Sequence, residues 1–175
     1  MLLSKVQIKL YAESGVDQPL DAFIPLFHSW IQQDSLGDMV YDVANYMHVP
    51  RGPGVLLVGH GSDYALDEGE GRPGLLYSRK RDLPSGASLV TDALRRALKA
   101  VELLNAAGVP GPSSFSSKEI LFSFTERLHV INDDASFELV RPTVAAALAE
   151  ILAGSQYKLT REGEPREPLT IRAVS

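Results

Sequence analysis

The residues best suited to chemistry lie in the segment 59–63, which reads Gly-His-Gly-Ser-Asp. The two glycines leave the backbone around His60 open to a ligand, because neither carries a side chain. A carboxylate at Asp63 could orient the imidazole and raise its basicity, as a general base requires. The segment therefore predicts His60 and Asp63 as candidate catalytic residues. The alternative interpretation is a plain turn in which His60 is an exposed loop residue.

The same region could instead hold a divalent metal ion, since imidazole and carboxylate groups are common metal ligands. The candidate ligands are His60, His48, Asp63 and Asp67. No two histidines have a recognised metal-binding spacing, and the acidic residues between 63 and 70 do not follow the EF-hand pattern. The sequence therefore leaves the metal, and any other cofactor, undetermined. The alternative is an acidic loop whose charges are solvated.

A second candidate site is basic. The expected ligand-binding residues are Arg72, Tyr77, Arg79 and Arg81, and alternation along a strand would place the last three on one side. Guanidinium groups bind phosphate or carboxylate, so this pattern predicts a site for a small anion. The alternative is that the arginines pair with nearby acidic residues across a hairpin.

Residues 69–74 match the G-x-G-x-x-G pattern of dinucleotide-binding loops. That fingerprint needs a strand before it and a helix after it, so that backbone amides face the pyrophosphate. Here Pro73 removes an amide and a β-like run follows. The segment therefore predicts a hairpin loop and no nucleotide site.

Hydrophobic periodicity indicates which elements must position these residues. A period of two predicts strands at residues 5–13, 39–46, 55–60, 75–81, 120–125, 157–161 and 169–174. Helical spacing predicts helices at residues 20–31, 88–107 and 142–153. We expect Pro142 at the first position of the third helix, and we expect residues 55–81 to form one long hairpin.

This order, β-α-β-β-β-α-β-α-β-β, predicts an α+β fold in which about three helices pack on a mixed or mainly antiparallel sheet. A chain of 175 residues falls in the size range of one domain, so we expect residues 1–175 to form a single domain. We expect strands such as 5–13 and 169–174 to form sheet edges. An exposed edge could pair with another chain and form a homo-oligomer.

The formal net charge of −5 weighs against binding to nucleic acid or to an anionic membrane surface. No apolar run approaches the roughly 20 residues of a membrane span. The chain has no cysteine, which excludes disulfides and thiolate metal sites and fits a reducing compartment. We therefore expect a cytoplasmic protein that binds neither nucleic acid nor membrane.

The sequence contains no nucleophile elbow, phosphate-binding loop or zinc motif. It therefore predicts a module that binds a small ligand or another protein and has no catalytic activity. The alternative is a small metal-assisted or acid–base enzyme centred on His60 and Asp63. Neither interpretation identifies a substrate, a ligand or a partner.

Overall fold

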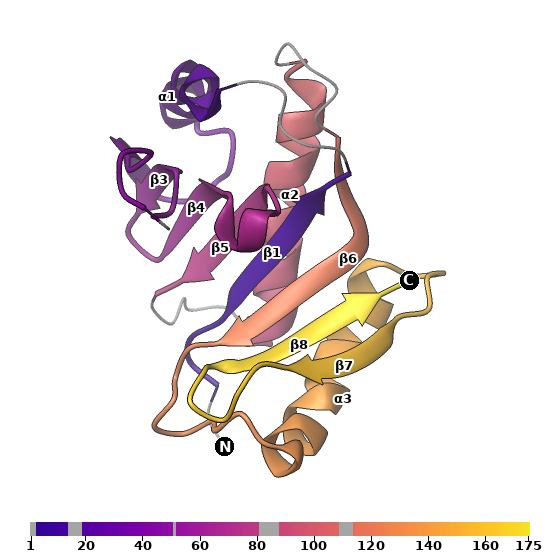
Figure 1. Ribbon diagram of the computed structural model, residues 1–175. Helices are drawn as coiled ribbons and strands as arrows, with labels where there is room; N and C mark the ends of the chain where they lie inside the picture. The colour runs from indigo at the N-terminus through magenta and orange to yellow at the C-terminus, as the bar shows by residue number, and fades with distance from the viewer. Residues whose placement is uncertain (1–2, 14–18, 51, 81–87, 109–113) are drawn as a thin grey trace.

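The computed structural model describes residues 3–13, 19–50, 52–80, 88–108 and 114–175. These residues form one 8-stranded sheet, in which every neighbouring pair of strands is antiparallel, and three α-helices (Figure 1). The prediction of an α+β fold with an antiparallel sheet and three helices is confirmed. No helix in the described ranges has the length and apolar character needed to cross a membrane.

The order of the strands places the first strand near the middle of the sheet. The strands are β1 (Gln7–Ala12), β2 (Val40–Asn45), β3 (Val55–Gly59), β4 (Ser62–Asp67), β5 (Gly74–Arg79), β6 (Phe115–Phe124), β7 (Lys158–Glu162) and β8 (Leu169–Val174). Across the sheet they follow the order β2-β3-β4-β5-β1-β6-β8-β7. The prediction that residues 5–13 and 169–174 lie at edges is wrong, because β1 and β8 each pair on both sides. The edge strands are β2 and β7.

Two of the helices cover one face of the sheet. Helix α2 (Leu89–Ala106) packs on β1, β5 and β6, and α3 (Asp134–Ile151) packs on β7, β8 and α2. Helix α1 (Ile24–Gln33), which follows a short 3-10 turn (Leu20–Phe23), lies beside β2 at one end of the sheet (Figure 1). We call the face opposite α2 and α3 the open face. Figure 1 is viewed toward it, with α2 and α3 behind the strands.

Capping residues set where the two long helices begin. The Ser88 side chain accepts a hydrogen bond from the Thr91 backbone N–H at 3.2 Å, which starts α2 as predicted. In α3 the Asp133 carboxylate accepts from the Ser136 N–H at 2.7 Å. The prediction that this helix begins at Pro142 is wrong, because Asp133 caps an earlier start and Pro142 lies inside the helix.

The segment 55–79 is a three-stranded meander, so the prediction of one long hairpin is wrong. The chain turns sharply after Gly59, and residues 62–67 return as β4, which pairs with both β3 and β5. A Cβ atom at Gly59 would lie 2.4 Å from the Ser62 carbonyl oxygen, so this turn requires glycine. Alternation did not predict a strand at residues 62–67, where Tyr64 and Leu66 belong to the core.

A buried polar cluster ties α2 to the sheet. It consists of Asp38, Ser62, Tyr64, Arg79, Asp92 and Arg96. The Asp92 carboxylate accepts hydrogen bonds from Arg79 Nη1 at 2.8 Å and from Arg96 Nε at 2.9 Å. Arg96 also forms an ion pair with Asp38. Buried charges are tolerated when they are paired in this way, and removing one partner is costly.

Tyr64 of this cluster and its neighbour Tyr77 differ in whether the hydroxyl group is hydrogen-bonded. The rings of Tyr64 and Tyr77 pack edge to face with centroids 5.2 Å apart, and both side chains are fully buried. The Tyr64 hydroxyl donates to Asp38, whereas the Tyr77 hydroxyl has no hydrogen-bond partner in the described part of the chain. Burial raises the pKa of Tyr77 to about 12 and also raises the pKa of Tyr64, so both hydroxyls stay protonated at neutral pH.

The same substitution at these two positions should therefore have opposite effects. A buried hydroxyl without a partner costs about 1–3 kcal/mol, so Tyr77→Phe should raise the free energy of unfolding by about 1 kcal/mol. Tyr64→Phe removes a hydrogen bond to a charged group and should lower it by about 1–2 kcal/mol. Urea unfolding of both variants measures the two shifts. Equal losses of stability in both would contradict the assignment of the unpartnered hydroxyl to Tyr77.

Candidate functional site

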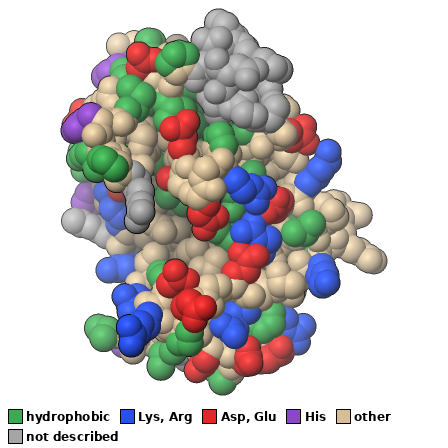
Figure 2. Space-filling model, in the orientation of Figure 1, with side chains coloured by type: hydrophobic (Ala, Val, Ile, Leu, Met, Phe, Trp, Pro, Cys, Tyr) green, Lys and Arg blue, Asp and Glu red, His purple; other side chains and the backbone are tan. Residues whose placement is uncertain are grey.

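The open face of the sheet carries polar and charged side chains at its centre. Along β1, Ile8 and Leu10 belong to the buried core, so alternation directs Lys9 and Tyr11 to the open face. Along β6, Phe122 belongs to the core and Glu119 lies on the open side. Figure 2 shows acidic and basic side chains interleaved across this face. The charges therefore neutralise one another locally.

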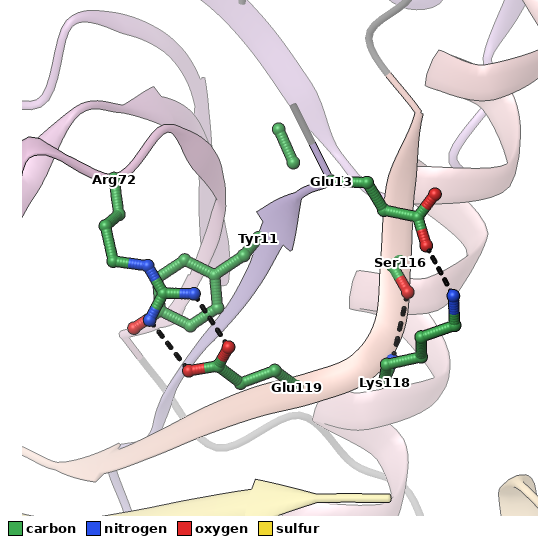
Figure 3. Close-up of a pocket in the computed structure, with 7 residues that line it drawn as sticks. Tyr11, Glu13, Arg72, Ser116, Lys118 and Glu119 are labelled. Carbon is green, nitrogen blue, oxygen red and sulfur yellow. Dashed lines mark hydrogen bonds and ion pairs between the residues drawn. The ribbon is translucent and has the colours of Figure 1, made fainter. Parts of the chain in front are cut away.

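A hollow of about 420 Å³ lies where β1 ends and β6 begins. We call it the open-face pocket, and its lining residues are Tyr11, Ala12, Glu13, Arg72, Ser116, Lys118 and Glu119 (Figure 3). Its volume falls within the range of about 300–1,000 Å³ that is typical of small-ligand sites.

One side of the open-face pocket is a rigid group of charges around an aromatic ring. The Arg72 guanidinium donates two parallel hydrogen bonds of 2.7 Å to the Glu119 carboxylate. The same guanidinium lies 3.9 Å from the centre of the Tyr11 ring. Arg172 also forms an ion pair with Glu119, and its Nη1 lies 3.4 Å from the Tyr11 hydroxyl. These four side chains hold one another in place.

The other side of the pocket is a more exposed ion pair. Lys118 Nζ donates to the Glu13 carboxylate at 3.0 Å, and the Ser114 hydroxyl donates to the same carboxylate at 3.1 Å. The Ser116 hydroxyl accepts from the Lys118 backbone N–H at 3.1 Å. Figure 3 shows this pair across the hollow from Arg72, Tyr11 and Glu119. The pocket thus has one cation and one anion on each side.

Protonation states follow from these contacts. The hydrogen bonds from Arg72 lower the pKa of Glu119, and the hydrogen bond from Lys118 lowers the pKa of Glu13. Burial raises the pKa of Tyr11. At neutral pH both carboxylates are therefore charged and Tyr11 keeps its proton.

A smaller hollow of about 180 Å³ lies beside the open-face pocket, further along the same two strands. Its lining residues are Gln7, Lys9, Asp67, Gly69, Glu70, Leu76, Leu121 and Ser123. Lys9 Nζ donates to Asp67 at 2.6 Å and to the Gly69 carbonyl at 3.0 Å. The Lys9 side chain is only 6% exposed, so its ammonium group is largely enclosed by these contacts.

Of the predicted anion-binding residues, only Arg72 lines the open-face pocket. Tyr77 lies in the core, and Arg79 lies in the buried polar cluster. Alternation did place Tyr77 and Arg79 on one side of β5, but that side faces α2 and not a ligand site. Arg81 lies outside the described residues. The structure therefore does not bring Tyr77 and Arg79 together with Arg72.

No hydrogen bond joins the predicted catalytic residues His60 and Asp63 in the part of the chain that the structure describes. His60 is exposed on the turn between β3 and β4, and its backbone N–H donates to the Met39 carbonyl at 2.8 Å. The Asp63 carboxylate accepts from Lys80 Nζ at 2.8 Å and from the Gly59 N–H at 3.1 Å. Among the residues that the structure describes, none bonds to the His60 imidazole.

The predicted metal ligands are dispersed. His48 is exposed on the turn after β2, Asp63 is bound to Lys80, and Asp67 is bound to Lys9. Over the described ranges, no group of three or more His, Cys, Asp or Glu side chains is arranged to hold a metal ion.

Sequence reasoning missed Tyr11, Glu13, Lys118 and Glu119. A partial signal was present, because polar residues alternate with apolar ones along β1 and mark a second face of the strand. That signal does not say which strand lies beside β1. Strand β6 begins over a hundred residues further along the chain, so nothing local connects these four residues.

Comparison with known proteins finds no match, whether to protein-family models, to curated proteins or to solved structures. The functional proposal therefore rests on the geometry of the open-face pocket.

Replacing Arg72 by Gln removes the two charge-assisted hydrogen bonds that Arg72 donates to Glu119 and leaves the ion pair between Glu119 and Arg172. The pKa of Glu119 should then rise toward its ordinary value of 4.5. Since the folded pKa is depressed, the ion pair stabilises the fold above pH 4.5, and this stabilisation is lost as the pH falls through the depressed value. The Arg72→Gln variant should lose less stability on acidification than the parent protein.

The measurement is a carbon-detected NMR titration of the side-chain carboxyls. Lys118→Gln is the matched control, because it should raise the pKa of Glu13 and leave that of Glu119 unchanged. An unchanged Glu119 titration in Arg72→Gln would show that Arg72 does not set its charge.

Proposed function

We propose that this protein is a binding module without catalytic activity, and that it binds a small zwitterionic ligand in the open-face pocket. Such a ligand carries one ammonium and one carboxylate group, as an amino acid does. The observation that carries the proposal is the placement of two ion pairs, Arg72 with Glu119 and Lys118 with Glu13, on either side of one hollow.

The balance of charge favours a zwitterion over a simple ion. A lone anion in the pocket would lie near Glu13 and Glu119, and a lone cation would lie near Arg72 and Lys118. Like charges at short range repel, so either ion would gain from one wall and lose to the other. A ligand with separated charges can direct each group to the opposite charge and keep the pocket neutral.

The two ion pairs differ in how readily they can exchange partners. The Lys118 side chain is 78% exposed and Glu13 is 44% exposed. Exposed pairs contribute only about 0–1 kcal/mol, so Lys118 can turn from Glu13 to a ligand carboxylate at little cost. Arg72 is fixed by the Tyr11 ring and by Glu119. We therefore assign Arg72 as the fixed anchor and Lys118 as the adaptable one.

The protonation states support binding over acid–base catalysis. An effective general base has a pKa near the working pH. The pKa values of Glu13 and Glu119 lie below their ordinary range, which makes both carboxylates weak bases, and the raised pKa of Tyr11 makes it a weak acid. These groups are suited to holding charge and poorly suited to transferring protons.

Three further parts of the proposal concern the protein's location, its partners and its self-association. We propose a cytoplasmic protein that does not bind nucleic acid, on the strength of its net charge of −5 and its lack of cysteine. We also propose that it self-associates through an edge of its sheet.

Binding can be tested by following backbone amide NMR signals while glycylglycine is added to the full chain. We expect shifts at Ser116, Lys118 and Ala12 with this zwitterion, and much weaker shifts with acetate or methylammonium at the same concentration. Arg72→Gln should weaken binding at least about tenfold, the loss expected from removing a charge-assisted contact.

The matched control is Arg141→Gln, which breaks an exposed ion pair with Glu138 on α3. It should leave the affinity unchanged. Binding of acetate as strong as that of glycylglycine would contradict the zwitterion assignment. Unchanged affinity in Arg72→Gln would place the ligand elsewhere.

A further inference from the structure

The two edges of the sheet are very different. Strand β7 carries Lys158, Arg161 and Glu162, and the last two form ion pairs within the chain. Charged side chains on an edge discourage pairing with another sheet. Strand β2 has the sequence VYDVAN, with Asp42 as its only charged residue. It therefore lacks the charges that protect β7.

Exposed apolar side chains gather at both ends of β2. Nine large apolar side chains are exposed in the described part of the chain, and five of them lie between residues 39 and 49. They are Met39, Tyr41, Tyr46, Met47 and Val49, with Met39 74% and Tyr41 59% exposed. Such a concentration on an unpaired edge is typical of a protein contact surface. We call residues 39–49 the β2 edge.

The backbone of β2 presents hydrogen-bonding groups to the outside. The Tyr46 N–H donates to the Gly54 carbonyl at 2.7 Å, and β2 pairs with β3 in the register Ala44 to Leu56. In an antiparallel ladder, every second residue directs its N–H and carbonyl toward the neighbouring strand. Tyr46 and Ala44 direct theirs toward β3, so Val43 directs its N–H and carbonyl away from β3. That N–H is bonded at 2.8 Å to the carboxylate of Asp42. The contact is exposed, so a second strand can displace it.

We propose that β2 pairs with β2 of a second copy of this chain, antiparallel and about a two-fold axis at Val43. The distribution of apolar residues points to a second copy. In an antiparallel pair the 39–41 end of one strand lies against the 46–49 end of the other. Both ends are apolar, so each copy covers the exposed side chains of the other. This self-complementarity is what an isologous dimer requires.

The charge of Asp42 favours one alignment of the two β2 strands over its neighbours. When Val43 lies opposite Val43 of the second copy, Asp42 lies opposite Ala44, and Tyr41 lies opposite Asn45. A shift of the axis to Asp42 would place two carboxylates directly opposite each other, which is destabilising. The Val43 register avoids this, and it uses the outward-facing groups of Val43 in both copies.

The first test is the mass in solution, measured by sedimentation equilibrium across a dilution series. The parent chain should approach twice 19.0 kDa at high concentration. Tyr41→Lys combined with Met47→Lys should give 19.0 kDa throughout, because the Val43 register places the two new charges diagonally across from each other on the same face at each end of the paired strands. The control Leu139→Lys changes an exposed apolar residue on α3 and should remain dimeric.

The second test fixes the register and does not depend on disruptive substitutions. The chain has no cysteine, so Val43→Cys introduces a unique thiol. Hydrogen-bonded residues in an antiparallel pair have Cα atoms about 5.5 Å apart, within the range for a disulfide. Val43→Cys should therefore form a covalent dimer on mild oxidation. Thr160→Cys, exposed on the other edge strand, should stay monomeric under the same conditions.

A parent chain that is monomeric at every concentration would overturn the proposal. So would a dimer that survives the double lysine substitution, or a dimer that Val43→Cys does not cross-link. Circular dichroism establishes that each variant is folded, and if the double variant is not, the cross-linking of Val43→Cys decides the matter. The dimer specifies the self-association proposed above. Its loss leaves ligand binding on the open face unaffected, so the dimer and the ligand site fail separately.

Discussion

The pairing of β1 with β5 on one side and β6 on the other is the interaction that makes this protein one sheet. Strands β2, β3, β4 and β5 form a continuous meander before α2, and β6, β8 and β7 form a second group after it. In the described structure, no strand of the first group pairs directly with a strand of the second group. The first group pairs with β1 through β5, and the second group pairs with β1 through β6. Removing β1 would leave two separate groups of strands that share only helix contacts.

The open-face pocket lies at this junction. Tyr11 comes from β1, Arg72 comes from the loop before β5, and Glu119 and Lys118 come from β6. On the opposite face, α2 packs against all three strands and is tied to β5 by the ion pair between Arg79 and Asp92. The junction is therefore held by apolar packing and a buried ion pair on one face, and by the ion pairs of the open-face pocket on the other.

The sequence predicted the elements well and their neighbours poorly. Alternation identified the strands at residues 5–13 and 120–125, and helical spacing identified α2, because these signals are local. Strand order is not local, and this is why β1 was expected at an edge. Strand β4 was missed because its Gly-Ser-Asp beginning resembles a loop.

The candidate site shows the same limit. Arg72 was singled out for its chemistry, but Glu119 lies 47 residues away and meets it only because β6 lies beside β1. Tyr77 and Arg79 were correctly placed on one side of a strand, yet only the position of α2 makes that side the interior. A pattern identifies the faces of a strand but does not say which face is covered.

The location of the open-face pocket also bears on how the molecule moves. Its lining residues come from two groups of strands joined through β1, and the ion pair between Arg72 and Glu119 already links the two groups. A ligand that contacts both Arg72 and Lys118 would add a second link between the two groups. Occupancy would then slow amide hydrogen exchange in β1 and at the start of β6, while the meander at the far end of the sheet would keep its own rate.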